Sequence, residues 1–122
     1  MRAGLGGERK ARLGALAALA RKAEGLLVLN LEGLSAITDY FLICCGTSTT
    51  QIGAIAEAIE GALKAEGSLP LHREGFPESG WIVLDYGDVV MHVFLEETRQ
   101  YYALEHLWGD APALSLEHSA GG

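Results

Sequence analysis

The segment Trp81–Leu95 constrains the fold of this chain more than any other stretch. β-Branched, aromatic and other apolar residues fill Trp81–Tyr86 and Val89–Leu95, and Gly87-Asp88 lies between the two runs. Glycine at the first central position favours a type II′ turn, so the sequence predicts a two-residue β-hairpin. An isolated hairpin is marginally stable in water, so further strands or a helix must pack against it.

This turn fixes which residues of the hairpin face each other. One face pairs Tyr86 with Val89, Leu84 with Met91, and Ile82 with Val93. The other face pairs Asp85 with Val90, Val83 with His92, and Trp81 with Phe94. A turn at Tyr86-Gly87 would instead set Asp85 opposite Asp88, an unfavourable like-charge pair. Both faces are apolar, so the first must lie on the core, and the second is either covered by another helical layer or forms part of a partner surface.

The N-terminal segment 8–24 has the spacing of an amphipathic helix. Its apolar positions are Leu13, Leu16, Ala17 and Ala20, with charged residues between them, and Gly25 is expected to end it. A secretory signal is not expected, because Arg21 and Lys22 follow the apolar run at once without a cleavage site. A transit peptide stays open as an alternative.

Two strands and a second helix follow. Apolar runs predict strands over 26–31 and 40–46. Ser48 and Gln51 have capping-box spacing, so a helix is expected from Ser48 until Gly67 ends it. One face of this helix contains Ile52, Ile55, Ala56, Ile59, Leu63 and Glu66.

The rest of the chain completes an α/β (α+β) fold. A short strand is expected near 69–74, then a loop marked by Gly75, Pro77 and Gly80, and a final helix over 96–108. We therefore expect a single domain over 8–110, with a mixed sheet of about five strands flanked by helices. Residues 1–7 and 111–122 are expected to be flexible termini.

The charge distribution restricts the class of partner. Residues 1–22 contain six basic side chains and one acidic side chain, whereas residues 23–122 contain three basic and fifteen acidic ones. Binding to nucleic-acid phosphates needs clustered Lys and Arg, so little direct nucleic-acid contact is expected. An acidic body fits a basic protein better. No apolar stretch approaches the roughly 20 residues that a membrane span needs.

The residues do not form a pattern typical of catalysis or metal binding. Cys44 and Cys45 point to opposite faces of one strand, and the four histidines lack ligand spacing. Gly46-Thr47-Ser48 leaves a strand and opens a helix, a geometry that can hold an anion. Asp85 and Asp88 diverge across a turn, however, so they do not form a paired Mg²⁺ site. We expect no enzymatic activity, no cofactor and no metal.

Three motifs together resemble the Iojap family, the ribosomal silencing factors. They are T-D-Y-F before G-T-S in 38–48, W-x-x-x-D-Y-G-D-V-V-x-H-x-F in 81–94, and Y-x-L-E-x-L-W-x-D in 102–110. The resemblance runs from about Arg9 to Pro112. It departs from the family pattern at Thr50, where many members carry a basic residue, and at Gly25 and Asn30, where acids are frequent.

The resemblance implies a non-catalytic relative of the nucleotidyltransferase fold. Such a protein would bind the large ribosomal subunit through ribosomal protein L-fourteen, block docking of the small subunit, and repress translation when nutrients are scarce. The partner-binding residues carried over from the motifs are Trp81, Asp85, Tyr86, Gly87, Asp88, His92, Phe94, Tyr101, Tyr102, Leu104 and Trp108. Bacterial members act in the cytoplasm and organellar members help to assemble large subunits; the bacterial case is expected here.

Two other functions stay open at this stage. A vestigial nucleotidyltransferase would bind a nucleotide with Mg²⁺. A homodimeric scaffold would use the second, apolar face of the hairpin to bind another copy when the protein is free.

Overall fold

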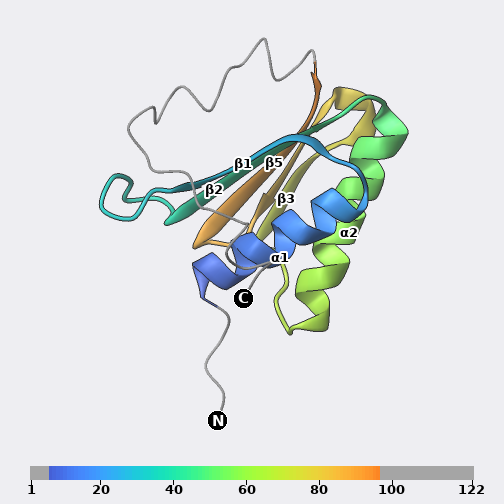
Figure 1. Cartoon of the computed structure of the whole chain (residues 1–122). Helices are drawn as coiled ribbons and strands as arrows, with labels where there is room; N and C mark the ends of the chain where they lie inside the picture. The colour runs from blue at the N-terminus through green and yellow to red at the C-terminus, as the bar shows by residue number, and fades with distance from the viewer. Residues whose placement is uncertain (1–5, 97–122) are drawn as a thin grey trace.

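The predicted hairpin forms part of a five-stranded mixed sheet with two helices on one side (Figure 1). The computed structural model describes residues 6–96. Its elements are α1 (Gly7–Ala20), β1 (Glu24–Asn30), β2 (Tyr40–Gly46), α2 (Thr49–Ala65), β3 (His72–Phe76), the short 3₁₀ helix η1 (Pro77–Ser79), β4 (Trp81–Asp85) and β5 (Val89–Leu95). The strand order is β1-β2-β5-β4-β3; β2 and β5 are parallel, and the other neighbours are antiparallel.

The predicted register of the hairpin is confirmed. All five Cα pairs from Trp81–Phe94 to Asp85–Val90 match the expected ones. The Tyr86 backbone N–H donates to the Val89 carbonyl at 2.9 Å. Gly87 has a φ of 88°, and Asp88 is not among the residues with positive φ, which fits a type II′ turn with glycine at its first central position.

The main core lies between the two helices and one face of the sheet. The α2 side chains Ile52, Ile55, Ala56, Ile59 and Leu63 are fully buried, as their spacing predicts. The predicted first face of the hairpin packs against them through Ile82, Leu84, Tyr86, Val89, Met91 and Val93. Gly67 ends α2 as predicted: it has a φ of 86°, and the N–H of Ser68 reaches back to the Leu63 carbonyl, so both belong to a Schellman motif.

The buried face of α1 differs from the predicted one. The residues that face the core are Ala11, Gly14, Ala15 and Ala18, whereas Leu16 and Leu19 are 49% and 45% exposed. A Cβ atom on Gly14 would lie 2.7 Å from the Met91 sulfur, so the helix backbone approaches β5 too closely for a large side chain. Small residues therefore fill most of this helix face. Of the predicted positions, Leu13 and Ala17 are partly buried against the core, whereas Leu16 and Ala20 are exposed.

The end of α1 was also predicted too late. The helix ends at Ala20, and Lys22 follows in the left-handed conformation, with a φ of 65°; Gly25 also has a positive φ, 59°, but lies beyond the helix end. The Ala23 N–H donates to the Ala18 carbonyl, which completes a Schellman motif around Lys22. Gly25 lies instead in β1, at a bulge between Glu24 and Leu27.

Two further local predictions need correction. The strand expected near 69–74 is β3 at His72–Phe76, so Gly75, expected in a loop, is a strand residue. Only one of the two hydrogen bonds of the predicted capping box of α2 forms. Ser48 Oγ accepts from the Gln51 N–H at 3.0 Å, but the Gln51 side chain accepts from the Thr47 N–H instead of the Ser48 N–H. The Gln51 amide also donates to the carbonyls of Arg21 and Lys22, which ties the end of α1 to the start of α2.

The second face of the sheet carries a separate apolar cluster. Its buried members are Leu29, Leu31, Phe41, Ile43, Cys45 and Phe94, with Trp81, Leu27 and Val90 packed beside them. Cys44 belongs to the main core and Cys45 to this cluster, which confirms that the two thiols point to opposite faces. Both described helices pack on the first face, so within residues 6–96 no helix covers the second. The predicted final helix, after Glu96, and the predicted domain end at 110 lie outside the described residues.

Candidate partner-binding site

The predicted partner-binding residues fall at opposite ends of the β4–β5 hairpin. Trp81 and Phe94 pair at one end, which we call the aromatic end, and Asp85–Asp88 form the turn at the other, the turn end. Tyr86 lies five positions after Trp81, about 17 Å away at the usual rise of a strand. The structure therefore divides these residues into two groups. Tyr101, Tyr102, Leu104 and Trp108 lie outside the described residues.

The aromatic end is a stack of rings on the second face of the sheet. The Trp81 and Phe94 ring centroids are 5.3 Å apart, and the His92 ring lies 5.8 Å from Phe94 and 4.6 Å from Phe41. β2 contributes Phe41 to this stack because it runs parallel to β5 with Phe41 beside Val90. Close ring contacts of this kind add stability beyond the area they bury.

A single hydrogen bond orients the two polar rings of this stack. The Trp81 indole N–H donates to His92 Nδ1 at 3.0 Å. Nδ1 must be unprotonated to accept this bond, so a neutral His92 carries its proton on Nε2. Burial lowers the pKa of His92 from 6.5 to about 4, so the ring is uncharged at neutral pH. The aromatic end thus presents an apolar, uncharged surface.

The turn end is held by charges and by the turn itself. Asp85 Oδ1 accepts from the Gly87 N–H at 2.8 Å, which fixes the turn. Asp88 Oδ1 pairs with Lys10 Nζ of α1 at 3.0 Å, and the Lys10 side chain is only 14% exposed. The Asp88 carbonyl accepts from the N–H groups of Asp39 and Tyr40. Part of the Asp88 charge is therefore satisfied within the chain.

Tyr86 differs from its neighbours because its side chain enters the main core. It is 4% exposed, and its buried hydroxyl has no hydrogen-bond partner among residues 6–96. Burial, reinforced by the charge of Glu60, raises the pKa of Tyr86 to about 12. The side chain is therefore neutral and packs under the turn.

Exposure separates contact residues from supporting ones. Trp81, Asp85, Gly87 and Asp88 keep intermediate exposure, whereas Tyr86, His92 and Phe94 are buried. In the free chain the first group can touch a partner, and the second shapes the surface beneath it. Sequence reasoning missed Phe41 and Lys10. The alternation of β2 could have placed Phe41 on this face, but no local signal pairs Lys10 with a residue 78 positions away.

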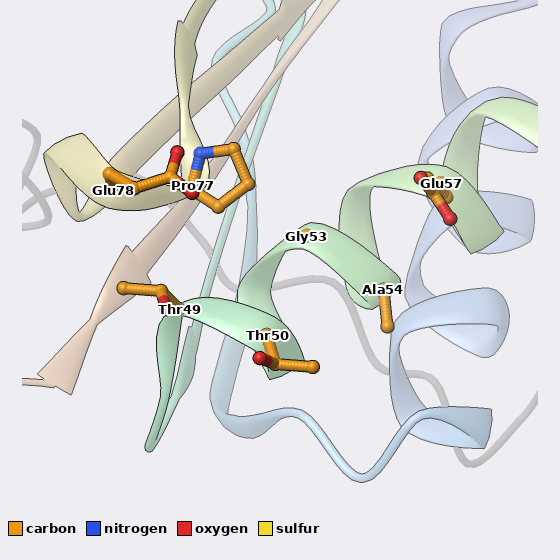
Figure 2. A pocket seen from close by; sticks show the side chains of 7 residues that line it. All are labelled: Thr49, Thr50, Gly53, Ala54, Glu57, Pro77 and Glu78. Atoms are coloured by element: carbon orange, nitrogen blue, oxygen red, sulfur yellow. The ribbon is translucent and has the colours of Figure 1, made fainter.

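A shallow groove at the start of α2 bears on the nucleotide alternative. It has a volume of about 340 Å³ and is lined by Thr49, Thr50, Gly53, Ala54, Glu57, Pro77 and Glu78. Figure 2 shows Glu57 and Glu78 at its two ends, with Pro77 above Gly53. The lining contains two carboxylates and no cation, so it repels the phosphates of a nucleotide. This groove therefore does not favour a nucleotide.

The described part of the chain contains neither a metal-binding cluster nor a membrane-spanning helix. Among residues 6–96, no group of three or more His, Cys, Asp or Glu is placed to hold a metal ion. No helix in the same range is long and apolar enough to cross a bilayer.

Comparison with known proteins shows that the chain is similar to ribosomal silencing factors. Residues 7–121 match the family model described as ribosomal silencing factor during starvation. A ribosomal silencing factor of Bacillus subtilis is 47% identical over 97 residues, which cover 80% of this chain and 82% of the relative. The chloroplastic protein Iojap of Zea mays is 35% identical over 95 residues, 78% of this chain and 41% of that longer protein. A crystal structure from Chromobacterium violaceum superposes with a TM-score of 0.82 at 30% identity, covering 86% of this chain and 88% of that one.

Proposed function

This chain belongs to the ribosomal silencing factor family, also called the Iojap family, and on that premise we propose how it silences ribosomes. It binds the large ribosomal subunit through ribosomal protein L-fourteen. Once bound, it occupies space that the small subunit needs, so the two subunits cannot join. The activity is non-enzymatic and needs no turnover. It represses translation when nutrients are scarce, and the bacterial cytoplasm is where we expect it to act.

One observation carries this proposal. The family match covers residues 7–121, and the described fold superposes on a relative's structure over most of both chains. The match therefore includes the sheet, both described helices and all the motif residues. A shared local motif on an unrelated fold would not produce such agreement.

The charge of the chain supports a protein partner rather than rRNA. The chain has a formal net charge of −7, and fifteen of its sixteen acids follow residue 22. Negative charge repels a phosphate backbone and attracts a basic protein. Ribosomal proteins carry the complementary sign, so electrostatic steering favours one of them as the first contact.

The aromatic end supplies an anchor of the kind that dominates protein interfaces. Trp81 is partly exposed, and its ring is held by the hydrogen bond to His92 and by contact with Phe94. Preorganised tryptophans are frequent energetic centres of interfaces, because little side-chain entropy is lost when they bind. We propose Trp81 as the main apolar contact. Tyr101, Tyr102, Leu104 and Trp108 are further proposed contacts, carried over from the family motif.

The turn end supplies the acidic contacts of this proposal. Asp85 and Asp88 face basic groups of the partner, and Gly87 shapes the turn between them. Because Asp88 already pairs with Lys10, Asp85 is the stronger of the two candidates. An interface of ordinary size, roughly 1,600 Å² in total, would reach both ends of the hairpin.

The proposal is tested by titrating the purified chain with isolated L-fourteen and measuring Kd. The wild-type chain should bind, and Trp81→Ala should bind at least about tenfold more weakly, the equivalent of 1.4 kcal/mol. Trp81→Phe keeps a packed ring and should lose less. Leu19→Ala, a truncation of a half-exposed side chain on α1, serves as the matched control and should bind like the wild type.

Two results would oppose the proposal. If the wild-type chain binds large subunits but not isolated L-fourteen, then L-fourteen is not its partner. If the wild type and a Trp81→Ala variant bind with equal affinity, the aromatic end is not part of the interface. Near-UV circular dichroism checks that the variant is folded.

A further inference from the structure

The described structure gathers exposed apolar side chains at one end of the sheet, beside the hairpin turn. Seven large apolar side chains are exposed within residues 6–96, and four of them lie at this end: Leu34, Ile37, Leu69 and Leu71. None of these four was among the residues predicted from the sequence to contact a partner. Single exposed apolar residues need no explanation, but a group beside a proposed interface does.

The strand pairings place these residues along a single row. At this end of the sheet, Asn30 pairs with Tyr40, Tyr40 with Val89, Val90 with Asp85, and Asp85 with His72. The β1–β2 loop, the β4–β5 turn and the segment before β3 therefore follow one another across five strands. Four strand spacings span about 19 Å. In Figure 1 the β1–β2 loop extends from the sheet at the left of the view.

Backbone hydrogen bonds connect the three segments of this row. The Asp88 carbonyl accepts from the N–H groups of Asp39 and Tyr40, at 3.2 and 3.0 Å. On the other side of the turn, the Leu71 N–H donates to the Asp85 carbonyl at 2.7 Å. The apolar residues are thus continuous with the turn end of the candidate site. Contact at the turn end would bring a partner against them.

The β1–β2 loop holds its apolar residues in place before any partner arrives. Leu34 and Ser35 both donate from their backbone N–H groups to the Leu31 carbonyl. Ser35 Oγ accepts from the Ile37 N–H at 3.1 Å, and the Leu31 N–H donates to the Asp39 carbonyl at 2.7 Å. Ile37 is nevertheless 85% exposed. A bonded loop that presents an exposed isoleucine is preorganised for docking, since little ordering entropy remains to be lost.

The charged residues around the row indicate the sign of the partner's charge. Three cations at this end are already paired: Lys10 with Asp88, Arg9 with Glu66, and Arg73 with Glu60. Within the described residues, Glu32, Asp39 and Asp85 form no ion pair. Glu32 accepts a hydrogen bond from the Tyr40 hydroxyl, and Asp85 accepts one from the Gly87 N–H. The row therefore combines carboxylates that form no ion pair among residues 6–96 with exposed leucine and isoleucine side chains.

We propose that this row, Leu34, Ile37 and Leu71 with Glu32, Asp39 and Asp85, extends the docking surface for the same basic protein of the large subunit. The inference rests on the proposed function, which supplies the ribosome as the target. It adds that the interface extends past the hairpin turn onto the β1–β2 loop. Apolar side chains anchor the partner, and the carboxylates steer its basic groups toward them.

The test compares two double variants by co-sedimentation with isolated large subunits. Leu34→Ser with Ile37→Ser removes two exposed anchors from the loop, so folding should be unaffected. Leu16→Ser with Leu19→Ser removes two exposed leucines from α1 and serves as the matched control. The loop variant should bind about tenfold or more weakly, and the control should bind like the wild type.

A charge variant separates steering from apolar contact. The Asp39 side chain forms no hydrogen bond or ion pair among those of the described residues, so Asp39→Lys leaves the fold intact. It should slow association, and the difference from wild type should shrink as salt rises, because exposed charges are screened within about 10 Å at 0.1 M.

The outcomes distinguish failure of this inference from failure of the proposed function. A loop variant that binds large subunits like the wild type overturns the docking surface and leaves the proposed function standing. A wild type that binds no large subunits overturns both. A loop variant that loses self-association in sedimentation, but keeps its affinity for large subunits, assigns the row to a second copy of the chain and also overturns the inference.

Discussion

The two ends of the β4–β5 hairpin are held by different forces. At the aromatic end, Trp81, His92 and Phe94 pack as uncharged rings, and burial provides the stability. At the turn end, Asp85 fixes the turn and Asp88 pairs with Lys10. One hairpin can therefore present an apolar anchor and a charged contact about 17 Å apart, each with its own sensitivity to mutation, pH and salt.

The largest expected effect lies at the aromatic end. Phe94 is fully buried, so Phe94→Ala removes its contacts and leaves a cavity. The free energy of unfolding should fall by about 3–5 kcal/mol, as measured by urea denaturation. A loss below about 1 kcal/mol would mean that the aromatic stack contributes little, and the contrast between the two ends would fail.

A second effect at the aromatic end depends on pH. Burial lowers the pKa of His92 from its ordinary value of 6.5 to about 4 in the folded chain, so the unfolded chain binds the proton more readily. Stability is therefore complete above pH 6.5 and declines as pH falls from 6.5 toward 4, by roughly 3 kcal/mol in total.

The measurement compares urea denaturation at pH 7.0 and pH 4.5 for the wild type and for His92→Gln. Glutamine does not titrate, so the variant should lose less stability on acidification. Identical losses in both proteins would show that His92 is not held neutral by burial.

A smaller effect is expected in the turn. Gly87 has a φ of 88°, a left-handed conformation that alanine adopts with strain. Gly87→Ala should lower the free energy of unfolding by roughly 1–2 kcal/mol, measured by urea denaturation. If Gly87→Ala does not measurably lower the free energy of unfolding, the type II′ turn is contradicted.

The smallest effect concerns the ion pair at the turn end. Asp88→Asn removes the charge that pairs with Lys10, and both side chains are partly exposed. The expected loss is about 0.5 kcal/mol in low salt and less at 1 M salt, because screening weakens the pair. Thermal unfolding at the two salt concentrations measures it; an unchanged difference at high salt would show that the effect is not electrostatic.

The sequence predicted the hairpin well because two independent signals agreed there. The apolar runs defined the strands, and Gly87-Asp88 defined the turn, so one register satisfied both. β2 and the buried face of α2 were correct for a similar reason: their apolar residues are large and regularly spaced. The family match, which spans residues 7–121, confirms the resemblance.

The sequence-based prediction failed where packing depends on small or exposed residues. The core face of α1 consists of alanines and Gly14. These small residues let the helix backbone approach Met91 closely, and their hydrophobicity matters less. All five residues of β3 are exposed, so no alternation marks its limits. Gln51 contacts carbonyls about 30 positions away, a tertiary contact that capping rules do not contain.

The candidate site was predictable residue by residue but not in its arrangement. The motifs include both Trp81 and Asp88, but the length of β4 places these two residues at opposite ends of the hairpin. The contribution of Lys10 depends on α1 reaching the turn, and the row of Leu34, Ile37 and Leu71 depends on the strand order. Neither follows from a local pattern, because both bring together segments that are distant in sequence.

The central claim is that the chain binds large subunits and prevents small subunits from joining them. The most direct test mixes purified large and small subunits with increasing amounts of the chain and resolves free subunits from joined ribosomes on a sucrose gradient. The account predicts that the chain sediments with large subunits only and that the joined fraction falls as the chain saturates them. Undiminished joining with the chain bound to large subunits would contradict steric exclusion.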